Sequence, residues 1–276
     1  MSDTAAEQPL GLGQEGRDYP ETVPLILLAD QVIFPMTLVP LKVTGTNEVK
    51  LLDDAAVGPR YVGIVALRDA ENDNRGPENA YEVGCLGRIM QLQHSPENQV
   101  SVVIQAMKRF RVAGVLQREP YPVVKVQVLE DEDGSGPDMD ALMAAVKNQV
   151  TSLIRLSPNI PDEAANVVRS IEDGGFLADL VTSNLAIPPA DKQKILETLN
   201  RKDRLERLAH VLGREIEMLE ISQKIQHDVR SSIDKSQREY LLREQLKAIQ
   251  GALGEGEKDA PEIKDYREKI NALKLP

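Results

Sequence analysis

The chain has 276 residues, a formal net charge of -11, 3% aromatic residues and one cysteine. This length allows two compact domains, or one domain with a long helix, around a core of Leu, Ile, Val and Ala. The composition excludes an internal disulfide, and no stretch reaches the roughly 18 apolar residues of a membrane span.

Cysteine use and charge also indicate the compartment and the partners. Cys85 lies in the apolar run 83–92, which favours a buried structural role over a reactive thiol. Residues 1–20 are polar and lack the apolar segment of a secretion signal. We therefore predict a soluble cytoplasmic chain without a membrane partner. The acidic excess lies in the first 200 residues and no face is basic, so nucleic acid is not an expected partner.

The first half of the chain is expected to be mostly strand. After a disordered tail at 1–21, short apolar runs bounded by turn residues predict seven strands, at 23–28, 38–43, 61–67, 83–92, 100–106, 109–116 and 122–129. Residues 47–57 predict one helix. A small twisted sheet or partly open barrel over 22–130 follows, because an alternating parallel architecture needs a helix after nearly every strand.

The second half is expected to be helical, which makes the fold class α+β. We predict a solvated acidic linker at 131–139, since its resemblance to a calcium loop fails at Leu142, where the loop needs a glutamate. Proline and glycine then divide 140–200 into a bundle of four short helices, at 140–156, 161–172, 176–185 and 188–199.

The segment 190–250 contains no proline and one glycine, Gly213, and predicts a very long helix. Asn200 is the expected N-cap, so this helix is assigned to 201–253, with a linker at 254–276. Its first part has a wide apolar face for packing, formed by Leu205, Leu208, Leu212, Ile216 and Leu219. A narrow stripe follows, formed by Ile225, Val229 and Ile233. A second apolar face, which could pack against a partner helix, lies near the end of the helix. It is formed by Leu242, Leu246, Ile249 and Leu253.

Motifs that would support catalysis are missing from the sequence. It has no G-x-x-x-x-G-K-[ST] phosphate loop, no G-x-S-x-G elbow and no H-E-x-x-H pair. His94, His210 and His227 lie far apart, which favours surface or packing roles over metal ligation. We therefore predict no catalytic, cofactor-binding or metal-binding residues in this chain.

Several segments together resemble the N-terminal region of Lon, the ATP-dependent AAA+ serine protease. They are PLILL at 24–28, VIFP at 32–35, LVPL at 38–41, YEVG at 81–84 and EPY at 119–121. The most specific is KSQREYLLREQLKAIQ at 235–250, close to a family signature on the long helix. Met36 departs from the pattern, because many members have glycine there.

This resemblance implies a function in substrate recognition and assembly. The chain stops at Leu275-Pro276, where the family's ATPase module would begin, so we expect a fragment without the protease dyad. The complete protein is expected to use ATP and Mg²⁺, to form a homohexamer and to degrade misfolded and tagged proteins. Unfolded or degron-bearing polypeptides are then the partners of this region, and no cofactor is expected in it.

Methionines are suited to binding many different chains, because their side chains are flexible. Met36 and Met218 are therefore the candidate substrate contacts, with Phe34 and Ile225 beside them, although for each of these four residues alone packing in a core or a helix seam is the simpler interpretation. Two other functions stay open. The chain could be a coiled-coil oligomerisation module, or a stand-alone binding domain without a protease, which a phosphate-loop motif encoded beyond Pro276 would rule out.

Overall fold

The computed structural model describes residues 19–72, 76–95, 99–134, 136–157, 160–161, 163–252 and 261–272. The chain divides into two compact units, residues 1–216 and 217–276, and each is described by itself. Most of the predicted tail lies outside the described residues. Tyr19, at its end, packs edge-to-face on Tyr61 with ring centroids 6.1 Å apart. The other domain limits given above stay predictions.

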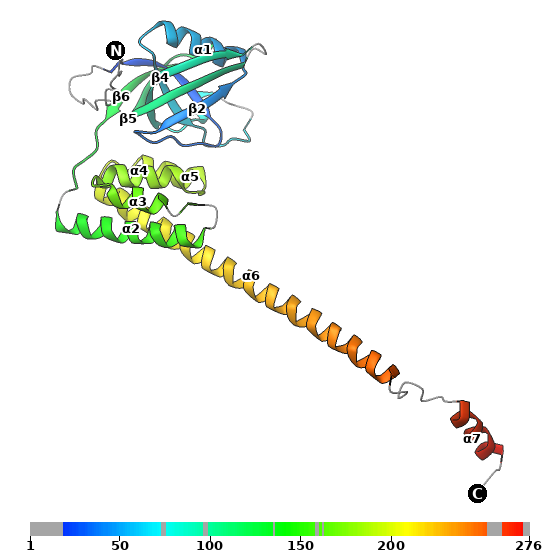
Figure 1. The fold of residues 1–276 in the computed structure, drawn as a ribbon. Helices are drawn as coiled ribbons and strands as arrows, with labels where there is room; N and C mark the ends of the chain where they lie inside the picture. The colour runs from blue at the N-terminus through cyan, green and yellow to red at the C-terminus, as the bar shows by residue number, and fades with distance from the viewer. Residues whose placement is uncertain are drawn as a thin grey trace, which may run out of the picture. The chain divides into compact units, whose positions relative to one another are not determined.

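Six strands make up the sheet of the first unit (Figure 1). They are β1 (Thr22–Leu28), β2 (Leu38–Val43), β3 (Tyr61–Ala66), β4 (Val83–Ser95), β5 (Gln99–Gln117) and β6 (Val123–Leu129). Seven strands were predicted, and this number was wrong, because the runs 100–106 and 109–116 are the two halves of β5. Pairing with β4 continues through Lys108, opposite Leu86, and a shift of register beside it allows the long strand to bend.

The strand order is β2-β5-β4-β3-β1-β6, and a further pairing of β5 with β6 closes five of these strands into a ring. β1 and β3 run parallel, and the other pairs are antiparallel. β2 stands outside the ring and pairs with the first half of β5. The bend in β5 therefore lets one strand contact β2, β4 and β6. The α+β class and the barrel-like sheet predicted from the sequence are confirmed.

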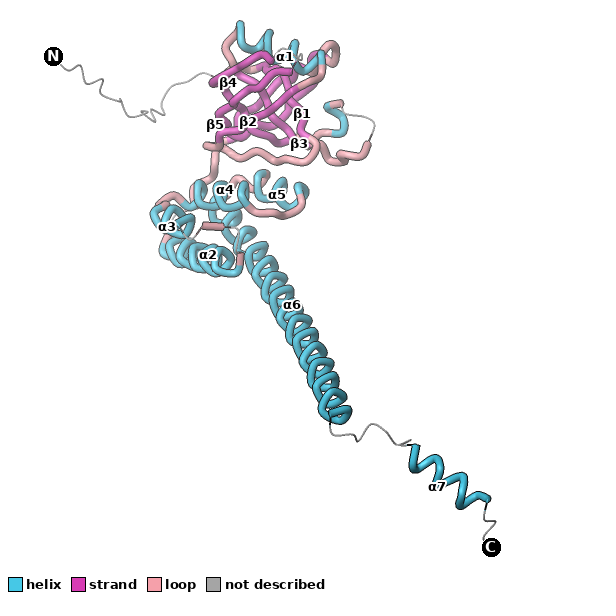
Figure 2. The backbone as a smooth tube through the Cα atoms, turned by 45° about the vertical axis from the view of Figure 1, so that its right-hand side comes forward, coloured by secondary structure: helices cyan, strands magenta, loops and turns pink. Residues whose placement is uncertain are grey.

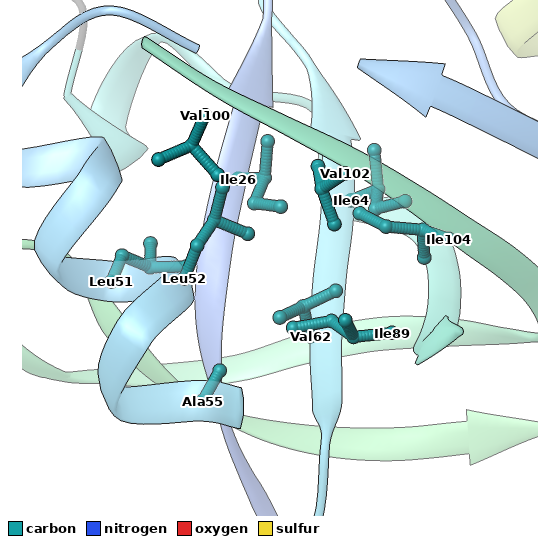
Figure 3. Packing of buried hydrophobic residues seen from close by; sticks show 10 residues of the cluster. All are labelled: Ile26, Leu51, Leu52, Ala55, Val62, Ile64, Ile89, Val100, Val102 and Ile104. Atoms are coloured by element: carbon teal, nitrogen blue, oxygen red, sulfur yellow. The ribbon is translucent and has the colours of Figure 1, made fainter. Parts of the chain in front are cut away.

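The core of the sheet consists almost wholly of aliphatic side chains. Helix α1 (Thr46–Val57) contributes Leu51, Leu52 and Ala55 to a cluster that continues on the strands (Figure 3), with Ile26, Val62, Ile64, Ile89, Val100, Val102 and Ile104. Both backbone views place α1 at one end of the sheet (Figures 1 and 2). Cys85 is buried, as predicted, and its thiol donates to the carbonyl of Ile33 at 3.0 Å.

After the sheet come helices α2 (Pro137–Leu156), α3 (Glu163–Ser170), α4 (Gly174–Asn184) and α5 (Pro189–Leu196). The prediction of four short helices is confirmed in number and in place. Asp173 caps α4 and accepts a hydrogen bond from the amide of Phe176 at 2.6 Å. A short 3-10 helix, η1 (Pro77–Asn79), precedes β4.

Helix α6 (Arg201–Ala252) begins where the sequence predicts. The side chain of Asn200 accepts hydrogen bonds from the amides of Lys202 and Asp203, at 3.0 and 3.2 Å. Leu205, Leu208 and Leu212 are buried in the first unit, and the helix continues through Gly213.

In the second unit, most of the large apolar side chains of α6 are exposed, including those of Ile225, Leu242, Leu246 and Ile249. Leu253 lies outside the described residues. A further helix, α7 (Pro261–Ala272), occupies part of the segment predicted as a linker.

Candidate functional site

Exposed apolar side chains lie on the outer side of strands β2, β5 and β4, among the polar side chains of Gln105, Arg88 and Gln91. Val39 and Ile104 face the core, so their neighbours on each strand face outward. Leu38 thus lies opposite Gln105, and Pro40 lies opposite Val103. Leu38 is 65% exposed. Side chains directly opposite each other on paired strands have Cβ atoms about 5 Å apart, so they form one continuous surface.

A bulge in β4 adds a methionine to this surface. Ile89 pairs with Ile104 and Gln91 pairs with Val103, which leaves Met90 as the extra residue between them. In a bulge, two residues oppose one residue of the partner strand. Met90 is 49% exposed. We define the outer apolar face as Met36, Leu38, Pro40, Met90 and Val103.

Met36, two residues before β2, has an unusual backbone conformation. Its φ is 62°, in the left-handed region where side chains other than glycine are strained. The amide of Met36 donates to the carbonyl of Ala106 at 2.9 Å, and the hydroxyl of Thr37 donates to the carbonyl of Phe34 at 2.6 Å. These bonds hold the turn and leave the Met36 side chain 42% exposed. The left-handed φ is the physical reason to expect glycine here.

The four predicted contact residues do not form one site. Phe34 is completely buried, so the structure gives it a role in supporting the turn and no surface of its own. Met36 lies on the outer apolar face. Met218 and Ile225 are exposed on α6 in the second unit. Leu38 and Met90, which the sequence analysis did not select, are exposed on β2 and β4 of the same sheet.

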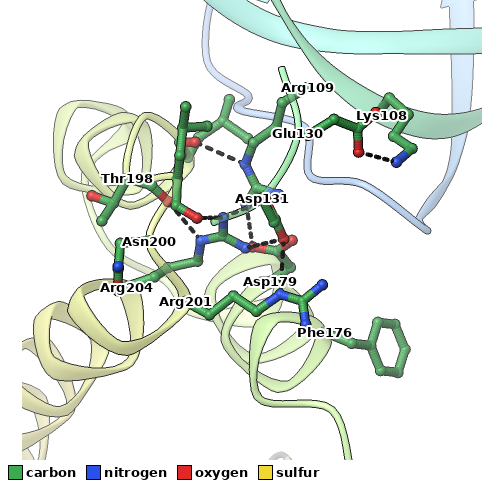
Figure 4. Close-up of polar contacts among 12 residues, drawn as sticks. Lys108, Arg109, Glu130, Asp131, Phe176, Asp179, Thr198, Asn200, Arg201 and Arg204 are labelled. Carbon is green, nitrogen blue, oxygen red and sulfur yellow. Dashed lines mark hydrogen bonds and ion pairs between the residues drawn. The ribbon is translucent and has the colours of Figure 1, made fainter. Parts of the chain in front are cut away.

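A cluster of buried charges joins the sheet to the helices (Figure 4). Arg109 on β5 places Nη2 2.5 Å from Oδ1 of Asp179 on α4, and Nη1 3.3 Å from Oδ1 of Asp131. Arg204 on α6 donates from Nη2 to Oδ1 of Asp131 at 2.6 Å, and from Nη1 to Oδ2 at 3.1 Å. Arg201 lies 3.7 Å from the same carboxylate. We call these five residues the ion-pair cluster.

The two buried arginines of the cluster also bind the end of α5. Nε of Arg109 donates to the carbonyl of Leu196 at 2.9 Å. Nε of Arg204 donates to the carbonyl of Thr198 at 2.8 Å, and its Nη2 donates to that of Leu199 at 3.2 Å. Carbonyls after the last helical turn lack a partner inside the helix and carry partial negative charge. The cluster therefore connects β5, α4, the end of α5 and the start of α6.

Burial and charge act in opposite directions on the acids of the cluster. Burial raises the pKa of Asp131, but the hydrogen bond from Arg204 and the charges of Arg109, Arg204 and Arg201 outweigh it and lower the pKa below 3.8. At Asp179 the same two effects oppose each other, with burial raising the pKa and the charges of Arg109 and Arg204 lowering it. Burial would also lower the pKa of Arg109, but Asp179 raises it above its ordinary value. The guanidinium therefore stays charged.

The sequence analysis missed this cluster, because it assigned Asp131 to a solvated linker and to no specific contact. Asp131 is largely covered, and Glu132 forms a parallel bridge with Asn200, with its amide donating to Leu199 at 3.1 Å. The segment is held because two buried arginines need a carboxylate. Little signal was present in the sequence, since Arg109 stands between Lys108 and Arg111 and so does not stand out as a lone charge.

A polar pocket of about 560 Å³ lies near the junction of the sheet with α5. Its charged and aromatic lining consists of Arg68, Tyr81, Glu82, Arg111 and Glu197. Arg68 lies over the ring of Tyr81, at 5.8 Å from its centroid, and pairs weakly with Glu82 at 3.9 Å. Acids and bases are equal in number, so the pocket has no strong preference for one sign of charge.

Neither a metal centre nor a membrane segment is found in the part of the chain that the structure describes. No group of three or more His, Cys, Asp or Glu side chains within the described ranges could hold a metal ion. None of the described helices has both the length and the apolar character needed to cross a membrane. A barrel-like sheet with an exposed apolar face, joined to a helical bundle, defines this class of protein as a binding module.

Comparison with known proteins gives the family. The profile of the substrate-binding domain of ATP-dependent protease La (LON) matches residues 22–214. The chain is 35% identical over 276 residues to a Lon protease of Chloroherpeton thalassium, and 34% identical over 277 residues to Lon protease 2 of Myxococcus xanthus. These matches cover 100% and 99% of this chain but only 33% and 34% of the relatives. The chain therefore belongs to the family of LON substrate-binding domains, and it spans about a third of the length of these relatives.

Two solved structures share the fold. The N-terminal domain of Mycobacterium avium complex Lon protease has a TM-score of 0.58 at 18% identity, and covers 70% of this chain and 98% of its own. The Lon N-terminal domain protein from Xanthomonas campestris has a TM-score of 0.50 at 17% identity, covering 68% and 96%. At this level of identity they support the architecture of the sheet and helices alone.

Proposed function

We propose that this chain captures unfolded or degron-bearing polypeptides for an ATP-dependent, Lon-like protease. The observation that carries the proposal is the family match over residues 22–214, which covers the sheet, the bundle and the start of α6. The outer apolar face supplies a surface suited to this task. It combines two flexible methionines with Leu38, and such side chains can adjust to many apolar sequences.

Other parts of the proposal concern the whole protein. ATP and Mg²⁺ would act outside this chain, because its sequence contains no phosphate loop and its described residues offer no metal site. Peptide-bond hydrolysis would likewise belong to other regions. We propose a homohexamer in the cytoplasm, in which Met218 and Ile225 of α6 provide further substrate contacts.

Binding to one protein in two states tests the proposed function. The probe is a fluorescently labelled disulfide protein, used in its native form and after reduction and alkylation, which keeps it unfolded. Anisotropy titration with the 276-residue chain should show at least tenfold tighter binding of the unfolded form. Equal affinity for both forms, or no binding to either, would refute the proposal.

The exposed apolar residues near the end of α6 support a second candidate, an oligomerisation module. Leu242, Leu246 and Ile249 follow a four-three step and are exposed in the second unit. If this is the main function, sedimentation will show a concentration-dependent oligomer that polar substitutions at these three positions abolish. A strict monomer that still binds unfolded chains would reject this second candidate.

A further inference from the structure

β2 has a free edge directly beside the outer apolar face. Among the described strands it pairs with β5 alone, from Leu38 opposite Gln105 to Val43 opposite Val100. A strand with one open edge is a template for any extended chain, which can add to it by backbone hydrogen bonds. An unfolded polypeptide captured next to such an edge could therefore pair with β2 as an added strand.

The pairing shows which backbone groups face this edge. The amide of Ala106 donates to the carbonyl of Thr37 at 2.9 Å, so this carbonyl points to β5. In an antiparallel ladder every second residue repeats this arrangement, and the N–H groups of Val39 and Leu41 therefore point to β5. The backbone groups of the residues between them, Leu38, Pro40 and Lys42, point to the free edge.

The middle position of this edge cannot donate a hydrogen bond. Pro40 has no N–H, and its ring occupies the space where an added strand would place its carbonyl. Lys42, exposed at the next outward position, brings a charge that an added apolar strand would have to cover. Among the three outward residues, only Leu38 and Lys42 have an N–H group that can donate, and Pro40 lies between them without one. A proline and an exposed lysine on an edge strand, here Pro40 and Lys42, are features that natural proteins use to block strand addition.

We propose that captured polypeptides are held by their side chains on the outer apolar face, and that Pro40 and Lys42 prevent them from adding as a strand to β2. This inference rests on the proposed function. Side-chain contacts keep no fixed register and leave the backbone of the captured chain free. A chain held in this way can slide and be passed on, whereas a chain added to the sheet would be fixed by a ladder of hydrogen bonds.

Amide hydrogen exchange measured by NMR, with and without a saturating apolar unfolded peptide, tests this mode of capture. In the wild-type chain we expect shifts of the methyl signals of Leu38 and Met90, and less than a twofold change in the exchange rates of the amides at positions 38 and 42. In the double variant Pro40→Thr/Lys42→Thr the same peptide should slow exchange at these positions at least tenfold. Lys125→Thr is the control, because β6 pairs with β1 on one side and with β5 on the other and so offers no free edge to an added strand.

The outcomes separate this inference from the proposed function. Protection of more than tenfold at positions 38 and 42 in the wild-type chain would overturn the inference while leaving substrate binding intact. Absence of any methyl shift and of any binding would overturn both. The wild-type measurement decides the question even if the double variant does not fold.

Discussion

Replacing Asp179 by Asn tests whether the ion-pair cluster holds the sheet and the helical bundle together. The substitution keeps the shape of the side chain but removes a carboxylate that lies 2.5 Å from Nη2 of Arg109 and 3.5 Å from Nη1 of Arg204. The side chains of these arginines are 3% and 0% exposed. Both guanidinium groups would then share Asp131 as their main charged partner.

The expected cost follows from this burial. Removing one partner of a buried ion pair costs about 3–5 kcal/mol, because the remaining charge is left without compensation. Asp131 still compensates part of the charge, so we expect a loss of about 3 kcal/mol, at the lower end of that range. In a unit of this size, each kcal/mol lowers the melting temperature by about 2–4 °C. The variant should therefore melt roughly 6–12 °C below the wild type.

Urea and thermal unfolding, followed by circular dichroism and tyrosine fluorescence, measure this difference. Asp191→Asn is the matched control, because Asp191 pairs with Lys194 and Arg214, whose side chains are both 66% exposed. Exposed ion pairs contribute about 0–1 kcal/mol, so this control should stay close to the wild type. If Asp179→Asn also lies within about 1 kcal/mol of the wild type, the cluster does not stabilise the fold as argued.

Three further substitutions test other parts of the structure by the same unfolding measurements. Met36→Gly should stabilise the chain by about 1 kcal/mol, because glycine adopts φ 62° without strain, and a loss of stability would contradict the left-handed turn. Gly84→Ala should destabilise by about 1–3 kcal/mol, since a Cβ there would lie 2.2 Å from the carbonyl oxygen of Ile64, whereas Gly114→Ala, with nothing within 4 Å, should be nearly neutral. Asp131 has a folded pKa below 3.8, so its contribution is complete above that pH and is lost as the pH falls through the folded pKa. Asp131→Asn should therefore flatten the loss of stability as the pH falls below about 4, and an unchanged slope would argue against the role assigned to this carboxylate.

Local signals explain why so much of the fold could be predicted from the sequence. Strand and helix positions follow from apolar periodicity and from proline and glycine, which act within a few residues. Asn200 marks the start of α6 because the cap bonds only its own next residues. The continuity of β5 was not visible in this way. It depends on pairing with β4, a separate run of the sequence, so Met107 and Lys108 looked like a break between two strands.

The candidate site shows the same division between local and distant effects. Met36 could be selected from its residue type and its place after a turn. Leu38 and Met90 could not, because they reach the same face of the sheet only through the register of β2, β5 and β4 and through a bulge that one strand alone does not reveal. The ion-pair cluster draws Arg109, Asp131, Asp179 and Arg204 from four separate segments, so no spacing in the sequence brings these residues together.

The most direct test of the central claim is the affinity of the double variant Leu38→Ser/Met90→Ser for the unfolded probe protein. Burying an exposed leucine or methionine side chain contributes about 1.5–3 kcal/mol, and these two are half to two-thirds exposed before binding. Together their loss should weaken binding by at least tenfold, which corresponds to about 1.4 kcal/mol. The matched control is Val57→Ser/Val167→Ser, which removes two exposed apolar side chains from α1 and α3 and should change the affinity by less than twofold. Equal effects of the two double variants, or an unchanged affinity in the first, would contradict capture by the outer apolar face.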